Sequence, residues 1–337
     1  MSLHKVYETI TADDVAQLAG VSRWTVHRAF KKDASISEKS RGKVMKAAET
    51  LGYVPDLLAV SLASDRSGLV ALLVDDFSNP QQIINLDMLT TALREAGWHT
   101  LVINTHDEDD ASAGLLQASQ HRVDAAVMVG ARFDDARLVD ALGAQRVRRL
   151  IIFGRKSNNP NTVSVCCDDV QAMTEITDYV LSRGYRRPLF LAGPPTVSVH
   201  LLRKGAFCDH WTAKTGDVPD VLVSDSFNPE HAQALIASHF ADMPKAALPD
   251  VIVCETDSLA MGVMDGLRYG LGLRVPEDVA VTGFDDSTFA RNGNYDLTTY
   301  RQPNNDLAQA VVQTLQSGAE PSQFDRLSGQ LVVRGSA

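Results

Sequence analysis

Short apolar runs alternate with helical segments from residue 69 to residue 282, and this alternation leaves few possible folds. The runs are continuously apolar rather than alternating apolar and polar, which is typical of strands buried on both faces of a parallel sheet. Helices between the strands then cover both faces of each sheet. The predicted strands are Leu69–Val74, Thr100–Ile103, Ala125–Val129, Leu150–Phe153, Val163–Cys166, Leu189–Ala192, Val221–Val223, Val251–Cys254 and Val279–Thr282.

The first 66 residues follow another pattern, that of short helices. Thr11 can cap a first helix that Gly20 ends, and Ser22 can start a second helix over Arg23–Phe30. A third helix begins after Ser37, ends at Gly52 and cannot continue past Pro55. The predicted apolar faces are Val15, Ala16, Leu18 and Ala19 on the first helix, Val26, Ala29 and Phe30 on the second, and Val44, Ala47, Ala48 and Leu51 on the third. Two short helices joined by a tight glycine turn indicate a helix-turn-helix unit.

Charge separates the same two regions. Residues 1–66 carry 10 Lys and Arg against 8 Asp and Glu, whereas the remaining residues carry 22 against 34. Between Arg23 and Lys32 there are four basic residues and no acid. A basic head on an acidic body favours contact with nucleic acid, because phosphate attraction depends on the docking face. A charge cluster this small is, by itself, more often just a solvated surface.

The head resembles the DNA-binding domain of the LacI family of transcriptional regulators, with its lambda-repressor-like helix-turn-helix. The string TADDVAQLAGVSRWTVHRAFKKDASISEKSRGKVMKAAETLGYVP contains a DVAxxAGVSxxTV core and a closing LGYxP. The resemblance implies that Arg23 and Trp24 contact bases, that Thr25 and Arg28 contact backbone and base edges, and that Ser37, Ser40, Arg41 and Tyr53 contact phosphates. Trp24 could instead be a core aromatic. His27 replaces the usual serine and Lys31 the usual asparagine. The full predicted DNA-binding set is Thr11, Ser22, Arg23, Trp24, Thr25, His27, Arg28, Lys31, Ser37, Ser40, Arg41, Tyr53 and Leu62.

Leu62 belongs to an apolar segment, residues 56–64, that is too short for a stable isolated helix. In the LacI family the equivalent segment folds on DNA and inserts a leucine into the minor groove, and Leu62 matches that leucine. Asp56 and Val60 stand where an asparagine and an arginine are frequent, and a plain apolar linker is the alternative. The expected domains are a helix-turn-helix domain at 1–54, a hinge at 55–66 and a core at 67–337.

The core also resembles the family. PEDVAVTGFDDS, LTTYRQP and LVVRGS are similar to its PxDxxVxGFDD, LTTxxQP and LVVRES motifs. The resemblance implies an α/β core of the type I periplasmic-binding-protein kind, with two lobes that each contain a parallel sheet. Lobe one is expected at about 67–165 and 300–325, and lobe two at about 166–299 and 326–337.

Ligands of open α/β sheets bind beyond the carboxyl ends of the strands. Together with the resemblance, this predicts an effector site at Asp75, Phe77, Asn79, Pro80, Ile83, Arg155, Leu202, Arg203, Phe227, Asp257, Phe284 and Asp285. Asp257 could also serve as a helix N-cap. Leu202 stands where the family usually has a ligand-gripping arginine, and Arg203 follows one place later. The implied effector is a small polar metabolite such as a sugar or sugar derivative.

Other function classes lack their motifs. No GxGxxG, GxxxxGK[ST], GxSxG or HExxH occurs where its chemistry needs it, and the histidines lack metal-ligand spacing. We therefore expect no enzyme, no catalytic residue, no metal and no cofactor. Four cysteines without CxxC spacing, no signal peptide and no run of about 18 apolar residues favour a cytoplasmic protein. The expected partners are near-palindromic operator DNA, the effector and a second copy in a homodimer, with no membrane. A solute-binding protein without DNA regulation is the alternative.

Overall fold

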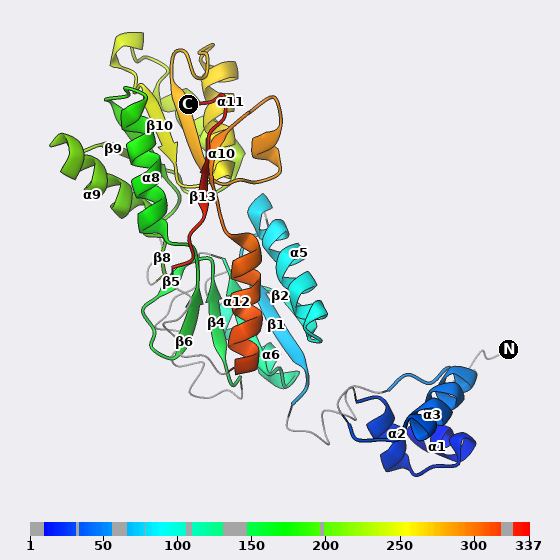
Figure 1. The fold of residues 1–337 in the computed structure, drawn as a ribbon. Coiled ribbons are helices and arrows are strands. Elements are labelled where there is room, and N and C mark those ends of the chain that lie inside the picture. The colour runs from blue at the N-terminus through cyan, green and yellow to red at the C-terminus, as the bar shows by residue number, and fades with distance from the viewer. Residues whose placement is uncertain are drawn as a thin grey trace. The chain divides into compact units, whose positions relative to one another are not determined.

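The structure is a computed structural model, and its fold is drawn in Figure 1. The chain divides into two compact units, residues 1–67 and 68–337, which are called the head and the core below. Each unit is described by itself. The structure describes residues 10–31, 34–55, 66–77, 79–105, 110–130, 147–195, 199–317 and 326–337.

The head contains three helices, α1 (Ala12–Ala19), α2 (Arg23–Ala29) and α3 (Glu38–Leu51). The side chains of Thr11, Ser22 and Ser37 accept hydrogen bonds at the three N-termini, so all three predicted caps are confirmed. Small side chains let the helices pack closely around one core. The buried apolar residues are Ala12, Val15, Ala16, Ala19, Val26, Ala29, Val44, Ala47 and Ala48.

The prediction that Leu18 packs inward is wrong, because its side chain is 54% exposed. Val15, Ala16 and Ala19 already fill the inner face of α1, so Leu18 falls on the outer face of this short helix. Gly20 follows with φ +66° and ends α1 in the left-handed conformation that glycine adopts without strain.

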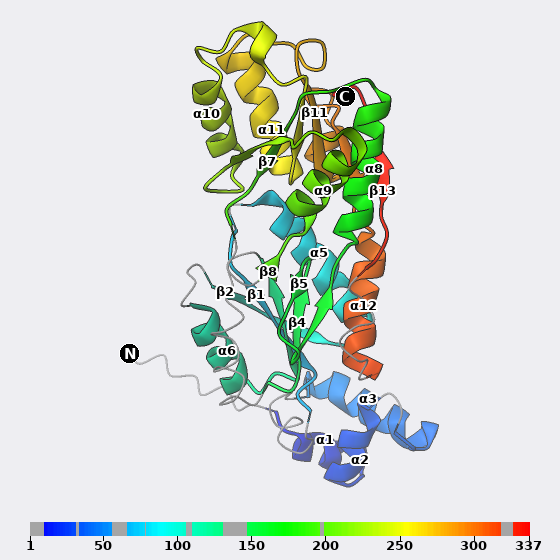
Figure 2. The same ribbon diagram turned by 90° about the vertical axis from the view of Figure 1, so that its left-hand side faces the viewer.

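Lobe one of the core is built on a five-stranded sheet of order β2-β1-β3-β4-β6 in which all neighbours are parallel. The strands are β1 (Leu69–Val74), β2 (His99–Asn104), β3 (Ala125–Val129), β4 (Leu150–Phe153) and β6 (Thr162–Val165). Helices α5 (Pro80–Glu95) and α12 (Asn304–Ser317) cover one face, and α6 (Asp110–Gln120) covers the other (Figure 2). Strands β1, β3, β4 and β6 are thus buried on both faces, which explains their continuous apolar runs, whereas the edge strand β2 is partly exposed.

Lobe two is built on a six-stranded sheet of order β13-β12-β11-β10-β7-β9. Its strands are β7 (Pro188–Ala192), β9 (Asp220–Val223), β10 (Val251–Cys254), β11 (Ala280–Asp285), β12 (Thr298–Arg301) and β13 (Gln330–Val332). Helices α8 (Asp169–Ser182) and α9 (Arg203–Thr215) pack on one face, and α10 (Pro229–His239) and α11 (Asp257–Asp265) on the other (Figure 2). Short strands β5 (Lys156–Ser157) and β8 (Val199–His200) form a separate antiparallel pair.

Two details differ from the sequence-based expectation. The second sheet is mixed rather than parallel, because β13 runs antiparallel to β12. Strand β12, which was not among the predicted strands, also belongs to this second sheet. No helix in the described part of the chain is long and apolar enough to cross a membrane.

Candidate nucleic-acid interface and effector site

Helix α2 displays large polar and aromatic side chains on its outer surface. Trp24 is 65% exposed, which rules out its alternative role as a core aromatic. The Arg28 guanidinium carbon lies 4.3 Å from the centre of the Trp24 ring, a cation–π contact between residues one helical turn apart. Arg23 Nη1 lies 3.2 Å from Asp13 Oδ2 of α1, and its Nε donates to His27 Nε2 at 3.4 Å. The outer face of α2 is therefore accessible, and its arginines already have neighbours.

The caps hold α2 in place. Ser22 Oγ accepts a hydrogen bond from the Thr25 backbone N–H at 3.2 Å and lies 2.9 Å from the Thr25 hydroxyl. At α1, Thr11 and Asp14 form a reciprocal capping box. Hydrogen bonds from the side chain and backbone of Thr11 lower the pKa of Asp14. Ser22, Thr25 and Thr11 thus stabilise the two helix starts, whatever else they contact.

Arg41 links α3 to the end of α2. Its guanidinium donates to the backbone carbonyls of Ala29, Lys31 and Ala34. Ser37 Oγ caps α3 and donates to Ser40 Oγ at 2.9 Å, and Tyr53 packs on the ring of Phe30 at 5.8 Å between centroids. These residues, expected at phosphates, have intramolecular roles here, and their contacts with DNA stay a prediction. The hinge, with Leu62, lies outside the described residues.

On lobe one, the predicted effector residues follow β1 and β4 at the carboxyl edge of the sheet. Asp75 is buried, and its carboxylate lies against the α-carbon of Gly130, which has no side chain to obstruct it. Arg155 is also buried. Asn79 caps α5 by accepting from the Gln81 N–H at 3.0 Å, and Pro80 is the first residue of that helix. Phe77 and Ile83 are the exposed apolar members of the set.

On lobe two, Arg203 is turned into the protein. Its Nε lies 3.0 Å from Asp169 Oδ1, its Nη1 donates to the Glu255 carbonyl at 2.8 Å, and its guanidinium stacks 3.6 Å from the centre of the Phe284 ring. Burial alone would lower the pKa of Arg203, but the carboxylates of Asp169, Asp285 and Glu255 raise it. Leu202, the preceding residue, stays 40% exposed.

Phe227 is buried rather than open for stacking. One edge of its ring covers the α-carbon of Gly193 so closely that a side chain at Gly193 would collide with it. Phe284 is buried as well and stacks on Tyr300 with 5.4 Å between ring centres. The apolar surface that these two rings offer to a ligand is therefore small, whereas Phe77 and Leu202 remain accessible.

The alternative role of Asp257 as a helix N-cap is wrong, because Thr256 caps α11 through the Leu259 N–H. The Asp257 carboxylate instead accepts from the Ser287 N–H at 2.7 Å and the Thr299 hydroxyl at 2.6 Å. Asp285 accepts from Gln302 Nε2 at 2.6 Å. Burial raises the pKa of both carboxyls, Asp257 to about 8 and Asp285 to about 6.

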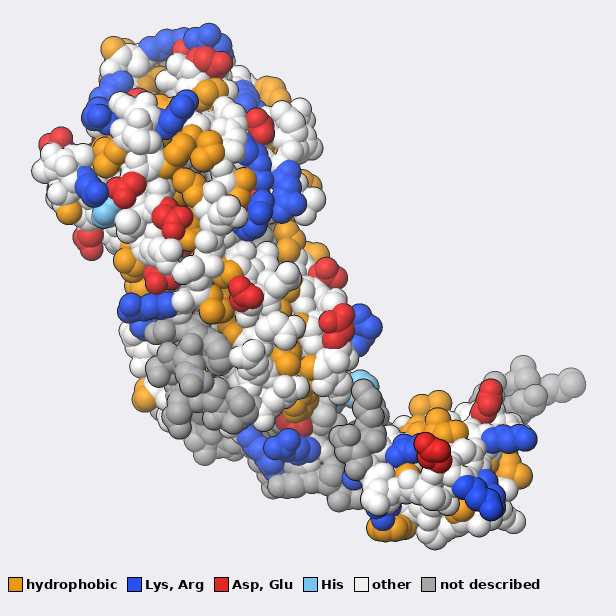
Figure 3. Space-filling view, viewed as in Figure 1, with side chains coloured by type: hydrophobic (Ala, Val, Ile, Leu, Met, Phe, Trp, Pro, Cys, Tyr) orange, Lys and Arg blue, Asp and Glu red, His pale blue; other side chains and the backbone are white. Residues whose placement is uncertain are grey.

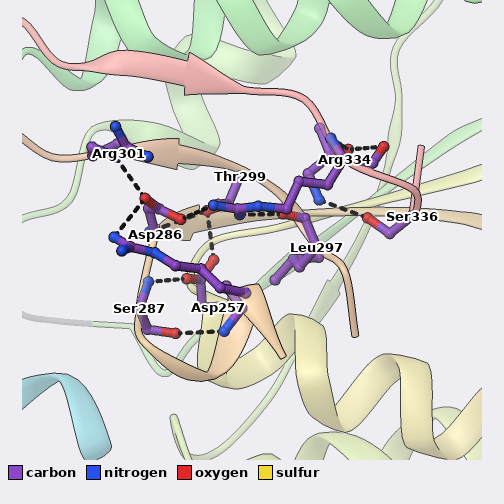
Figure 4. A network of polar contacts seen from close by, with 11 residues as sticks. Asp257, Asp286, Ser287, Leu297, Thr299, Arg301, Arg334 and Ser336 are labelled. Atoms are coloured by element: carbon purple, nitrogen blue, oxygen red, sulfur yellow. Dashed lines mark hydrogen bonds and ion pairs between the residues drawn. The ribbon is translucent and has the colours of Figure 1, made fainter. Parts of the chain in front are cut away.

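A network that the sequence reasoning missed surrounds Asp286 (Figure 4). Its fully buried carboxylate forms ion pairs with Arg291, Arg301 and Arg334 at 2.5 to 3.0 Å. Burial alone would raise the pKa of Asp286, but the three guanidinium groups hold it below its usual value. The arginines of LTTYRQP and LVVRGS, set beside the second aspartate of GFDDS, were the available signal.

The backbone explains why so many contacts meet here. Asp285 and Asp286 have φ values of 125° and 51°, a region that non-glycine residues rarely adopt. Such a conformation persists when the surroundings fix it. The Asp286 N–H donates to Thr299 Oγ1, and the ion pairs fix the carboxylate. The network thus holds the end of β11 in the conformation that places Asp285 at the edge of the sheet.

Elsewhere in lobe two there is a cavity of about 570 Å³. It lies at the amino ends of β7 and β9, between Arg186, Arg187, Trp211 and Phe240, and contains none of the predicted effector residues. Within the described residues, no group of three or more His, Cys, Asp or Glu side chains could hold a metal ion.

Comparison with known proteins identifies both units. Residues 11–56 match the model of bacterial regulatory proteins of the lacI family, and residues 177–337 match that of a periplasmic binding protein-like domain. The sucrose operon repressor of Escherichia coli is 28% identical over 333 residues, covering 96% of this chain and 98% of the relative. The regulator MalR of Streptomyces coelicolor is 29% identical over 343 residues, covering 96% and 95%. The chain belongs to the LacI family.

Solved structures agree with this assignment. The lac repressor bound to ONPG has the same fold, with a TM-score of 0.81 at 22% identity, covering 98% of this chain and all of that one. The complex of the regulator CelR with cellobiose gives a TM-score of 0.67 at 26% identity, covering 97% and 100%. The LacI-family chain is therefore a DNA-binding transcriptional regulator with a two-lobed effector-binding core. The named relatives are transcriptional regulators, not enzymes.

Proposed function

We propose that this LacI-family regulator represses transcription by binding a near-palindromic operator as a homodimer in the cytoplasm. The outer face of α2, with exposed Arg23 and Trp24 and half-buried Arg28, is the observation that carries this proposal. The second helix of a helix-turn-helix enters the major groove, where arginine donates to guanine O6 and N7. Two heads related by a two-fold axis then contact two half-sites.

We further propose that a sugar or sugar derivative binds between the two lobes and changes operator affinity. Buried polar side chains lie at the carboxyl edge of each sheet, which is the expected position of a ligand in open α/β sheets. The names of similar proteins support the class, since they include sucrose and ribose operon repressors and a complex with cellobiose. The effector shifts the equilibrium between lobe arrangements only by its difference in affinity for them.

Leu202 favours an effector unlike those gripped by an arginine at this position. Its exposed side chain offers dispersion contacts and no hydrogen bond, and Arg203 is already bound by Asp169 and the Glu255 carbonyl. We therefore expect a sugar that presents a less polar face to lobe two. The alternative function, a solute-binding protein without DNA regulation, leaves the outer face of α2, with Arg23 and Trp24, without a role.

Selection from a random duplex library with the full chain tests the proposal. We expect enrichment of a near-palindrome, and a change in the bound fraction when sucrose, cellobiose or ribose is added. No enriched sequence would contradict the DNA-binding role. Enrichment without any response to the three sugars would contradict only the proposed effector class.

A further inference from the structure

The two arginines on the outer face of α2 are held in different ways. Arg28 rests on Trp24, a residue of its own helix. Arg23 instead contacts Asp13, which lies on α1 ten positions earlier, as well as His27 of its own helix. Among the described residues, Asp13 is therefore an acidic side chain that contacts the proposed base-contacting surface from a neighbouring helix. On the head surface in Figure 3, basic and acidic side chains lie next to each other.

We propose that Asp13 is a specificity-determining residue that positions the Arg23 guanidinium for one guanine of the operator half-site. The inference rests on the proposed function, in which α2 contacts bases. Nothing in the comparisons assigns a role to Asp13. It acts through Arg23 and is thus a positioning residue rather than a base contact.

The Arg23 guanidinium is held in place by its contacts with Asp13 and His27. Asp13 is in the first turn of α1, where the capping box of Thr11 and Asp14 sets the helix start. Its carboxylate accepts from Arg23 Nη1, while Arg23 Nε donates to His27. N–H groups on both Nη atoms remain for a bidentate contact, and guanine O6 and N7 are the matching acceptors. The guanidinium plane is thereby held from two sides before DNA arrives.

The charge of Asp13 affects DNA binding in two ways. A carboxylate beside a recognition helix repels phosphates and so weakens binding to every DNA sequence. Bound to Arg23, the same carboxylate also keeps that guanidinium from moving to a phosphate, which favours a base contact over a sequence-independent one. Both side chains of the pair are more than half exposed to water, so the ion pair adds little to the stability of the head. Its effect is expected in specificity.

This predicts two changes of opposite sign in Asp13→Asn. Discrimination for guanine at one position of each half-site falls about tenfold, because Arg23 loses its support. Affinity for scrambled duplex rises, because one negative charge is gone. A role confined to the stability of α1 would lower both affinities and would appear in thermal unfolding of the head.

The experiment is a parallel selection with the full chain, comparing the wild type, Asp13→Asn, Asp13→Glu and Glu49→Gln, followed by titration of scrambled duplex. Glu49→Gln is the matched control, since it removes an exposed charge of α3 without touching Arg23. We expect it to raise affinity for scrambled duplex and leave base preferences unchanged, while Asp13→Glu retains the guanine preference. Asp13→Asn made in an Arg23→Ala background should change no base preference.

Each other outcome has a definite meaning. If Asp13→Asn behaves like Glu49→Gln, Asp13 is only a surface charge and the inference is overturned. If Asp13→Asn alters a preference for cytosine that persists without Arg23, Asp13 contacts a base itself and the positioning role is wrong. A wild type that enriches no sequence overturns the proposed function, and the role of Asp13 with it.

Discussion

The outer face of the head and the end of β11 in lobe two both gather arginines around an aspartate, yet they do so in opposite settings. In the head, Arg23 meets Asp13 with both side chains more than half exposed, and the partners are ten positions apart. In lobe two, a fully buried Asp286 meets Arg334, whose side chain is 13% exposed and which lies 48 positions further along the chain. The more exposed Arg291 and Arg301 approach the same carboxylate from the surface. Exposed charges remain available to an outside partner, whereas buried ones are committed to the fold.

The difference separates two uses of the same chemistry. Loss of one partner from a buried pair leaves uncompensated charge and costs much stability, while an exposed pair contributes about 0–1 kcal/mol. Substitutions in lobe two should therefore change unfolding first, and substitutions on α2 should change DNA binding first. Four predictions test this contrast.

The largest effect is expected at Asp286. Asp286→Ala removes the carboxylate that Arg291, Arg301 and Arg334 share. Arg334, whose side chain is 13% exposed, is left as a largely buried charge, whereas Arg291 and Arg301 are 59% and 44% exposed and stay solvated. The free energy of unfolding of the core should fall by about 3 kcal/mol. Urea unfolding measures this. Asp178→Ala, which removes a half-exposed carboxylate paired with Lys214 and His210, is the control and should cost at most about 1 kcal/mol. Equal losses of unfolding free energy in the two variants would show that the Asp286 network stabilises the core no more than an exposed ion pair does.

The second effect is a pH dependence of the core. Burial raises the pKa of Asp257 to about 8 and that of Asp285 to about 6, from 3.8 in the unfolded chain. The folded core then retains protons that the unfolded chain has lost. The contribution of the two protonated carboxyls to the free energy of unfolding is therefore full below pH 3.8 and is lost as the pH rises through 6 and 8. The free energy of unfolding should fall by up to about 1.4 kcal/mol per pH unit for each carboxyl.

Unfolding measured from pH 5 to pH 8 checks this sign. Asp257→Asn should remove most of the decline that this pair causes above pH 6, where Asp257 is the one of the two that is still protonated. An unfolding free energy that rises over this range, or a slope unaffected by Asp257→Asn, would show that the two carboxyls are ionised in the folded core.

A smaller effect is expected on α2. Arg28→Ala should weaken operator binding by about 1–3 kcal/mol and relax one base preference, with little change in unfolding. Electrophoretic mobility shift with single-base operator variants measures it. The control is Arg274→Ala, at an exposed arginine of the core, which should change neither operator affinity nor base preference. If operator affinity and base preference are unchanged in Arg28→Ala, α2 is not the recognition helix.

The smallest effect is expected from substitution of Trp24, whose ring contacts the Arg28 guanidinium. Trp24→Leu should reduce discrimination at the base contacted by Arg28 by about 0.5–1 kcal/mol, because the guanidinium loses its cation–π support. A double-mutant cycle with Arg28→Ala isolates that coupling. Strictly additive losses would mean that Trp24 contacts DNA independently of Arg28.

Local features were predictable and long-range ones were not. The caps at Thr11, Ser22 and Ser37 follow from residues within three positions. Nine of the strands follow from their apolar runs, whereas β5, β8, β12 and β13 were not predicted. Leu18 was misplaced because a helix of eight residues has room for few inward positions.

The missed contacts join distant segments. Arg203 meets Asp169 across 34 positions and Asp286 meets Arg334 across 48, and neither pairing leaves a local pattern. Thr256 rather than Asp257 caps α11 because the Asp257 carboxylate is occupied by Ser287 and Thr299, which lie 30 and 42 positions away.

The central claim is that the full chain recognises one DNA sequence through α2. The most direct test is the ratio of its affinities for the enriched duplex and for a scrambled duplex of equal length, both at physiological salt. We predict a ratio of about 10³ or more, as is typical of specific regulators. Equal affinities, each falling with salt in the same way, would mean that phosphate attraction alone holds the chain on DNA and would contradict the account.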